Sequence, residues 1–255
     1  MPKFSANLGF LWTELDLCNA VKAAKKAGFD AVECHFPFST PTEDLIKTLE
    51  ETGLEMLSLN TAPGDISAGE FGLNALPNRV DEAQTAIKQA IDYASVIGTT
   101  KVHVMSGTAP ATNEAMAVFM SNLKYAAELA QPLGIDILIE PINRRDVPDY
   151  FLADLTTAVK IIDQLGYENI KIMFDCYHIQ IIHGEIKPLL KKHIDLIGHI
   201  QFASVPQRHE PDEGDIDYAE LFKWLDELAY DGYIGAEYKP RGTTDEGLGW
   251  MDRFR

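Results

Sequence analysis

Four apolar runs in the second half of this 255-residue chain each end in a polar side chain that could bind a cation. The runs IDILIE, IKIMFD, IGHIQ and YIGAE end in Glu140, Asp175, Gln201 and Glu237. Burying three carboxylates near one another is costly unless a positive charge compensates them, and none of the runs ends in Lys or Arg. A divalent cation would supply that charge. Because all four side chains offer hard oxygen donors, the set favours Mg²⁺ or Mn²⁺ over zinc.

A simpler interpretation is open for each of these residues taken alone. A carboxylate at the end of a strand can cap the helix that follows or pair with a basic residue. The succession of such residues at four consecutive strand ends favours the metal site over unrelated caps.

The elements that would position these side chains alternate along the whole chain. Short apolar runs of strand type are followed by stretches with apolar residues three and four positions apart, which is typical of repeated βα units and a parallel sheet. The predicted strands are Phe4–Leu8, Ala31–His35, Glu55–Asn60, Lys101–Met105, Asp136–Glu140, Ile170–Asp175, Ile197–Gln201 and Tyr233–Glu237. The predicted helices are Leu15–Ala27, Thr42–Thr52, Arg79–Ile97, Asn113–Gln131, Leu155–Leu165, Ile186–His193 and Tyr218–Leu228.

Eight strands alternating with helices predict an α/β fold, a single (β/α)8 TIM barrel. Such a barrel takes roughly 250 residues, so we expect one catalytic domain over residues 1–255. In a barrel the reactive groups lie where strands end, which would bring the four polar ends to one mouth. An open doubly wound sheet is the alternative, but the sequence has no strand–GxGxxG–helix segment for its usual nucleotide chemistry.

Composition limits the classes of partner. The 22 Lys+Arg against 39 Asp+Glu give a formal charge of −17, which opposes binding to nucleic acid or to anionic membrane surfaces. No apolar run approaches the ~18 residues that a membrane-spanning helix needs, and no secretory signal is evident at the N-terminus. The three widely spaced cysteines are typical of a reduced compartment and read as small buried hydrophobes. We therefore expect a cytoplasmic protein.

Several segments resemble a known family. LIEPIN, FDCYH, HIQ and GAEYKPRGTTDEGLGW are similar to the hydroxypyruvate isomerase family, a branch of the xylose isomerase-like TIM barrels that includes the 2-oxo-tetronate isomerases. The similarity runs from FSANLGF to GLGWMDRFR, and EYKP and RHEPDEGDIDY are its most specific parts. The resemblance implies a metal bound by Glu140, Asp175, Gln201 and Glu237, with Glu140 and Glu237 also serving as the acid–base pair. Related epimerases carry a histidine at the position of Gln201, so the glutamine points to this branch.

The activity that the resemblance implies is aldose–ketose isomerisation of a small sugar acid, hydroxypyruvate to tartronate semialdehyde, through a cis-enediolate. That chemistry needs a base, an acid and an electrophile that holds the developing charge. NTAPGD, VHVMSG and RHEPDEG look more like the 2-oxo-tetronate isomerases, which act on a four-carbon acid, whereas LIEPIN and FDCYH look like the hydroxypyruvate enzymes. A related ketose epimerase, a noncatalytic sugar-acid-binding barrel and a multi-zinc apurinic endonuclease are the other interpretations, and an oligomer is possible.

Candidate substrate-binding residues lie near the predicted mouth. His178 follows the sixth strand and could hydrogen-bond a substrate oxygen, or could simply be held by its turn. Arg208, in the long segment FASVPQRHEPDEGDIDY, could hold a substrate carboxylate with two parallel hydrogen bonds, with Lys239 and Arg241 as competitors. His103 is out of phase with its apolar neighbours in KVHVM and could face the substrate or be a hydrogen-bonded core histidine.

Two further features carry weaker expectations. The segment NTAPGDISAGEFGLNALPNR, after the third strand, could be a lid that excludes water from a reactive intermediate or a static loop. Asn7, His35 and Asn60 end the first three strands and could line the wall opposite the four polar ends.

Overall fold

The computed structural model describes residues 2–254 of the chain. These residues form two compact units. Unit 1 comprises residues 2–57, 175–192 and 199–254, and unit 2 comprises residues 58–174 and 193–198. The single catalytic domain over residues 1–255 stays a prediction.

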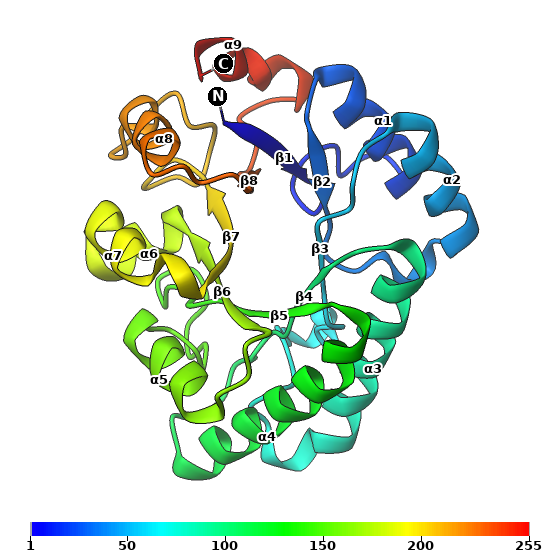
Figure 1. Cartoon of the computed structure of the whole chain (residues 1–255), viewed down its shortest axis with the longest axis vertical. Coiled ribbons are helices and arrows are strands. Elements are labelled where there is room, and N and C mark those ends of the chain that lie inside the picture. The colour runs from blue at the N-terminus through cyan, green and yellow to red at the C-terminus, as the bar shows by residue number, and fades with distance from the viewer. Residues whose placement is uncertain (1, 255) are drawn as a thin grey trace. The chain divides into compact units, whose positions relative to one another are not determined.

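Unit 1 contains a parallel sheet in the order β2-β1-β8-β7 (Figure 1). Its register pairs Ser5 with Gly235 and Gly235 with Gln201, so three neighbouring strands are aligned at one level. The strands are β1 (Lys3–Asn7), β2 (Ala31–Glu33), β7 (Ile197–Phe202), which enters the unit at its third residue, and β8 (Tyr233–Ala236). The helices are α1 (Leu17–Ala27), α2 (Thr42–Thr52), α6 (Cys176–His183), α7 (Ile186–His193), α8 (Tyr218–Glu227) and α9 (Met251–Phe254), with 3₁₀ turns at Pro37–Ser39 and Asp245–Trp250.

Unit 2 contains a parallel sheet in the order β6-β5-β4-β3, with α3 and α4 packed on each other and against these strands (Figure 1). The strands are β3 (Ser58–Asn60), β4 (Lys101–His103), β5 (Asp136–Ile139) and β6 (Ile170–Asp175), whose last residue belongs to unit 1. The helices are α3 (Val80–Ile97), α4 (Asn113–Ala130) and α5 (Leu155–Leu165), with 3₁₀ turns at Ile66–Ala68, Pro77–Arg79, Gln131–Leu133 and Ile194–Leu196.

The helix ends follow from short side-chain signals. Asp16, Asp154 and Asp217 precede α1, α5 and α8, and each carboxylate accepts a hydrogen bond from a backbone N–H of the first turn that the helix itself cannot satisfy. At the other end of α1 and α5 the chain turns through glycines in the left-handed conformation, which stops the helix.

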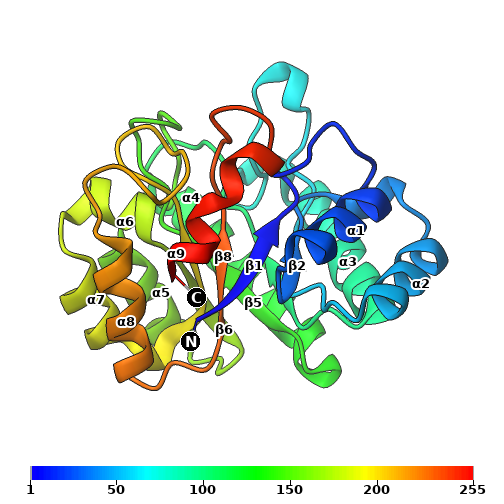
Figure 2. The same ribbon diagram turned by 90° about the horizontal axis from the view of Figure 1, so that it is seen from above.

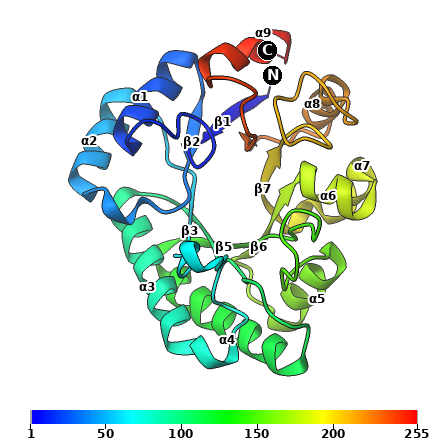
Figure 3. The ribbon, with the colours of Figure 1, turned by 180° about the vertical axis from the view of Figure 1, so that it is seen from behind.

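The core of unit 1 is aromatic. Phe4 of β1 packs edge-to-face on Phe202, Phe222 and Trp250, with ring centroids 5.9, 5.2 and 5.1 Å away. Phe222 also contacts Phe254, so the C-terminal α9 packs beside the first strand of the chain, near α8 (Figures 2 and 3). These edge-to-face pairs fix the position of β1 and β7 relative to α8 and the C-terminal segment.

Each of the eight predicted strands is confirmed, with boundary differences of at most three residues. Seven predicted helices are confirmed as well. The sequence analysis missed α6 and the four-residue α9. The eight residues of α6 begin directly after a strand and are apolar on most sides, which hides the helix. No helix in residues 2–254 is both long enough and apolar enough to cross a bilayer.

Candidate active site

Glu237, directly after β8, is a buried carboxylate held from two sides. Nη2 of Arg208 donates to its Oε1 at 2.7 Å, and Nδ2 of Asn7 donates to its Oε2 at 2.9 Å. Burial raises the pKa of Glu237 to about 8; Arg208 opposes this shift and Asp175 adds to it. A carboxyl group with a pKa near neutrality can both hold and release a proton, as a general acid or base must.

Arg208 lies in the loop between β7 and α8 and is firmly positioned. Its guanidinium lies between the rings of Phe10 and Tyr177, with centroids 4.8 and 5.0 Å from Cζ. Its backbone adopts a φ of 59°, which is unfavourable for a side chain of this size, and its carbonyl accepts from the Lys239 N–H at 2.7 Å. The loop therefore supplies, beside the end of β8, the positive charge that the strand ends themselves lack.

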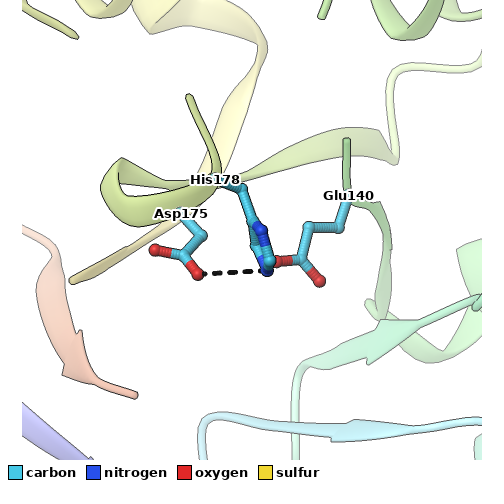
Figure 4. Close-up of side chains that lie close together, drawn as sticks. All are labelled: Glu140, Asp175 and His178. Carbon is cyan, nitrogen blue, oxygen red and sulfur yellow. Dashed lines mark ion pairs between the residues drawn. The ribbon is translucent and has the colours of Figure 1, made fainter. Parts of the chain in front are cut away.

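The two carboxylate oxygens of Asp175, at the end of β6, have different partners: one caps a helix, and the other faces the side chains of His178 and Arg208. Its Oδ1 accepts from the backbone N–H of Tyr177 at 2.9 Å and so caps α6, as the simpler interpretation expected. Its Oδ2 lies 3.6 Å from Nε2 of His178 and 3.5 Å from Nη2 of Arg208. Figure 4 shows the pair of Asp175 and His178, both of which are buried.

Gln201, at the end of β7, is buried with its amide in a fixed orientation. Its Nε2 donates to Oε2 of Glu33 at 2.7 Å. Its Oε1 is shielded from solvent, and no hydrogen-bond donor within residues 2–254 reaches it. An orphaned buried carbonyl oxygen costs free energy unless a ligand satisfies it, so this atom is suited to bind a cation.

Glu33 is a buried carboxylate that the sequence analysis did not single out. It accepts from Ser5 Oγ at 2.9 Å and from Gln201, and Nε2 of His199 lies 3.1 Å from both of its oxygens. Burial alone would raise the pKa of Glu33, but His199, Gln201 and Ser5 together hold it below its ordinary value. The available signal was a glutamate within the apolar run AVECH and a histidine two residues before Gln201, on the same face of β7.

Glu140 and His103 lie together in unit 2. Glu140 follows β5, His103 ends β4, and Nδ1 of His103 lies 3.8 Å from Oε2 of Glu140. Both side chains are buried. His103 therefore lies beside one of the two predicted catalytic glutamates, and its contact with substrate stays a prediction.

Lys239 and Arg241, the two other candidates for binding a substrate carboxylate, have different surroundings from Arg208. The Lys239 side chain is exposed, while its backbone N–H donates to the Arg208 carbonyl and its carbonyl oxygen lies 2.7 Å from Nδ1 of His209. Arg241 pairs with Glu210 at 2.9 Å and with Asp212 at 2.6 Å, which ties two loops together. Of the three basic residues, the structure brings Arg208 to the strand-end carboxylates of unit 1.

The predicted lid segment is hydrogen-bonded to its own unit at several points, among them the Ala75 N–H to the Ser106 carbonyl and Asn74 Nδ2 to the Met105 carbonyl, both at 2.8 Å. Gly72 pairs with Ser106 in unit 2, and Arg79 binds Glu70 at 2.6 Å across the segment. Ile66 and Phe71 remain exposed. Closure of this segment over a substrate stays a prediction.

Comparison with known proteins identifies the family. A model of the family described as "Xylose isomerase-like TIM barrel" matches residues 21–254. The chain belongs to this family. The match confirms the predicted α/β barrel class and the resemblance stated from the sequence.

Individual relatives in the xylose isomerase-like family cover the whole chain. A 2-oxo-tetronate isomerase of Cupriavidus necator is 45% identical over 257 residues, which span 100% of this chain and 99% of the relative. The hydroxypyruvate isomerase of Escherichia coli is 39% identical over 258 residues, with 100% of both chains covered. A crystal structure described as an AP endonuclease, family 2, from Brucella melitensis superposes with a TM-score of 0.95 at 36% identity, again over 100% of both chains.

Proposed function

We propose that this chain is an aldose–ketose isomerase of a small sugar acid, with residues 1–255 acting as one catalytic domain. Hydroxypyruvate, converted to tartronate semialdehyde, is the first candidate substrate. The observation that carries the proposal is Glu237, a buried carboxyl group at a strand end that Arg208 and Asn7 hold in place, in a chain 39–45% identical to named isomerases. An isomerase needs such a group to move a proton between adjacent carbons at neutral pH.

A 2-oxo-tetronate is the second candidate substrate. It is favoured by the 45% identity to the Cupriavidus necator relative, against 39% for the Escherichia coli hydroxypyruvate isomerase. The two substrates share a carboxylate next to an oxo or hydroxy carbon and differ by one carbon. The proposed chemistry is the same for both.

A divalent cation, Mg²⁺ or Mn²⁺, is part of the proposal. Glu140, Asp175, Gln201 and Glu237 would hold it, because the barrel fold directs the C-terminal ends of all strands to one face. The donor set fits such an ion: carboxylate oxygens, the orphaned Oε1 of Gln201, and His178 as a further neighbouring group. When bound, the cation would polarise the carbonyl and hydroxyl oxygens of the substrate.

The side chains of this chain divide the remaining work. Glu140 and Glu237, directly after β5 and β8, act as the acid–base pair: one takes the proton from carbon, and the other delivers its own proton to the adjacent carbon. Arg208 binds the substrate carboxylate, since the planar guanidinium can place two parallel N–H donors against the two oxygens of a carboxylate. His178 and His103 hydrogen-bond substrate oxygens. The rings of Phe10 and Tyr177 hold the guanidinium in place and exclude water.

An assay in D₂O tests the proposal. The protein, incubated with Mn²⁺ or Mg²⁺, is offered hydroxypyruvate, a 2-oxo-tetronate and a panel of neutral ketoses, and both product formation and deuterium incorporation at the substrate carbon are followed by NMR. We expect exchange and isomerisation with at least one acid. Absence of both with every acid in the panel would contradict the proposal, and turnover of ketoses alone would favour an epimerase.

Nuclease activity is the outcome that we expect to be absent. The Brucella melitensis structure is described as an AP endonuclease, but a charge of −17 opposes the approach of a polyphosphate strand. Cleavage of abasic DNA by the protein would overturn this part of the proposal.

A further inference from the structure

Three strand positions lie at one level inside unit 1, and the side chain of Glu33 reaches them from the neighbouring level. The register aligns Ser5 of β1, Gly235 of β8 and Gln201 of β7. Glu33, at the end of β2, reaches this level and contacts both Ser5 and Gln201. A charged side chain therefore connects strands that are not neighbours in the order β2-β1-β8-β7.

Gly235 makes this connection possible. A Cβ atom at position 235 would overlap Oε1 of Glu33 and lie 3.0 Å from Cγ of Gln201. The backbone of Gly235 has no left-handed conformation that would require glycine. The glycine therefore serves to leave room for the carboxylate of Glu33.

The hydrogen bond between Glu33 and Gln201 determines which way the amide faces. An ionised carboxylate accepts hydrogen bonds and donates none, so only the NH₂ group of Gln201 can face Glu33. The carbonyl oxygen is then directed away from Glu33, where no donor within residues 2–254 meets it. Ser5 and His199 bind the same carboxylate and prevent it from turning away.

We propose that Glu33 is a positioning residue that fixes the Gln201 amide with its carbonyl oxygen directed to the divalent cation. This inference rests on the proposed function, in which Gln201 is a ligand. A glutamine ligand without such a partner could present either its oxygen or its NH₂ group, and the NH₂ group would repel a cation. Glu33 thereby makes an amide as reliable a ligand as a carboxylate without adding negative charge at the cation.

Mn²⁺ affinity of the Glu33→Gln variant tests the inference. The new amide can donate to Gln201 as well as accept from it, so the Gln201 amide is free to turn. We expect the Kd for Mn²⁺, measured by electron paramagnetic resonance and calorimetry without substrate, to rise roughly 10- to 100-fold, the usual effect of losing a partner of a metal ligand. Circular dichroism and thermal unfolding establish that the variant is folded.

Glu210→Gln is the matched control. Glu210 is also a buried carboxylate of unit 1, but it pairs with Arg241 and makes no recorded contact with Gln201. We expect its Kd for Mn²⁺ to stay at the wild-type value. An equal weakening in both variants would mean that loss of any buried carboxylate has this effect, and would overturn the inference.

A double variant separates positioning of Gln201 from a purely structural role of Glu33, because only positioning predicts that a second substitution restores Mn²⁺ affinity. In Glu33→Gln/Gln201→Glu the hydrogen bond is reversed, because the new amide donates to the new carboxylate, which again directs an oxygen outward. We expect this protein to bind Mn²⁺ more tightly than either single variant, since Gln201→Glu alone sets two carboxylates against each other. Binding no tighter than in both single variants would argue against positioning.

The outcomes separate this inference from the proposed function. Wild-type Mn²⁺ binding together with unchanged binding by a folded Glu33→Gln protein overturns the positioning role and leaves the metal site intact. Absence of Mn²⁺ binding by the wild-type protein overturns both. If Glu33→Gln does not fold, Ser5→Ala replaces it: this variant keeps the carboxylate but removes one donor, and a Kd equal to that of the wild type would overturn the role of the network.

Discussion

Arg208 Nη2 lies 2.7 Å from Oε1 of Glu237, while the Arg208 guanidinium is held between the rings of Phe10 and Tyr177. One cationic group thus contacts a predicted catalytic carboxylate from a position that the two rings fix. Burial raises the pKa of Glu237, and the positive charge of Arg208 opposes that rise. A residue that the sequence suggested only as an anchor for substrate therefore also affects the charge of one glutamate of the proposed acid–base pair.

Replacing Arg208 should affect both substrate binding and turnover. In Arg208→Ala we expect the KM for an acidic substrate to rise, because the partner of its carboxylate is lost, and kcat to fall, because Glu237 loses its neighbouring charge. In Arg208→Lys the charge remains but the planar stack and the paired N–H donors do not, so the rise in KM should persist while kcat recovers in part. Steady-state kinetics of both variants measures this split, and Arg241→Ala serves as the control for loss of a nearby arginine. An unchanged KM in Arg208→Ala would move the anchoring role to another residue.

The two predicted catalytic glutamates should each be needed for turnover. In Glu140→Gln and Glu237→Gln the side-chain shape is kept and the ability to exchange a proton is lost. We expect kcat to fall by roughly 10²- to 10⁴-fold in each, the usual contribution of a general acid or base, while substrate still binds. Rapid-quench turnover and calorimetric substrate binding measure the two effects. Near-normal kcat in either variant would refute the scheme with two carboxylates.

The sequence predicted the fold and nominated candidate site residues, for reasons that particular residues illustrate. Glu140, Asp175, Gln201 and Glu237 could be named as candidates because strand periodicity locates strand ends, and barrel chemistry lies there. Glu33 was missed because it is the last residue of β2, and the predicted strand continued to His35. Its role depends on the register that aligns Ser5, Gly235 and Gln201, which no local pattern specifies.

Arg208 illustrates the other limit of the sequence. Its side chain could be named as a candidate for binding substrate, because its loop is long and the expected substrate carries a carboxylate. Its contacts with Glu237 and Asp175 could not, because they depend on a left-handed backbone at Arg208 and on two rings distant in sequence. The helix-capping role of Asp175 was foreseen as an alternative to metal binding, and one carboxylate can serve both because its two oxygens face different partners.

Metal removal should abolish activity and lower thermal stability. After dialysis against a chelator we expect no isomerisation, and recovery with Mn²⁺ or Mg²⁺ but not with Ca²⁺, whose larger radius suits a wider set of oxygen ligands. Because a ligand that binds the folded state stabilises it, Mn²⁺ at 100 times its Kd should raise the unfolding free energy by about 2.7 kcal/mol. Calorimetric Tm values with and without Mn²⁺ measure this, and full activity in the chelated protein would contradict the metal proposal.

Acid should destabilise the protein through His35. Burial lowers the pKa of His35 to about 4, and the positive charge of Arg208 contributes, while Glu33 opposes the shift. In the unfolded chain the histidine has its ordinary value of 6.5, so between pH 6.5 and about 4 the unfolded state takes up a proton that the folded state does not. The unfolding free energy should therefore decrease as the pH falls through this window. Urea unfolding of the wild type and of His35→Gln at several pH values measures the effect. The difference in unfolding free energy between the two proteins at each pH contains the contribution of His35, because the titratable groups that both proteins share contribute equally. Parallel pH profiles would exclude His35 as the cause.

Gly235→Ala should disturb the protein although it adds a single methyl group in the interior of a strand. The new Cβ would overlap Oε1 of Glu33, so either the strand shifts or the carboxylate leaves Ser5 and Gln201. Overpacking of this kind costs about 1–3 kcal/mol of unfolding free energy. Gly249→Ala is the matched control, since a Cβ at Gly249 meets nothing within 4 Å, and this change should leave stability equal or slightly higher. Denaturant unfolding compares the stabilities of the two variants.

The same substitution should also affect metal binding if Glu33 positions Gln201. Gly235→Ala should then weaken Mn²⁺ binding while Gly249→Ala does not, because displacement of the Glu33 carboxylate releases the Gln201 amide just as replacement of Glu33 would. A stable Gly235→Ala protein with unchanged Mn²⁺ affinity would mean that the space beside Gly235 is not needed to hold Glu33 against Gln201.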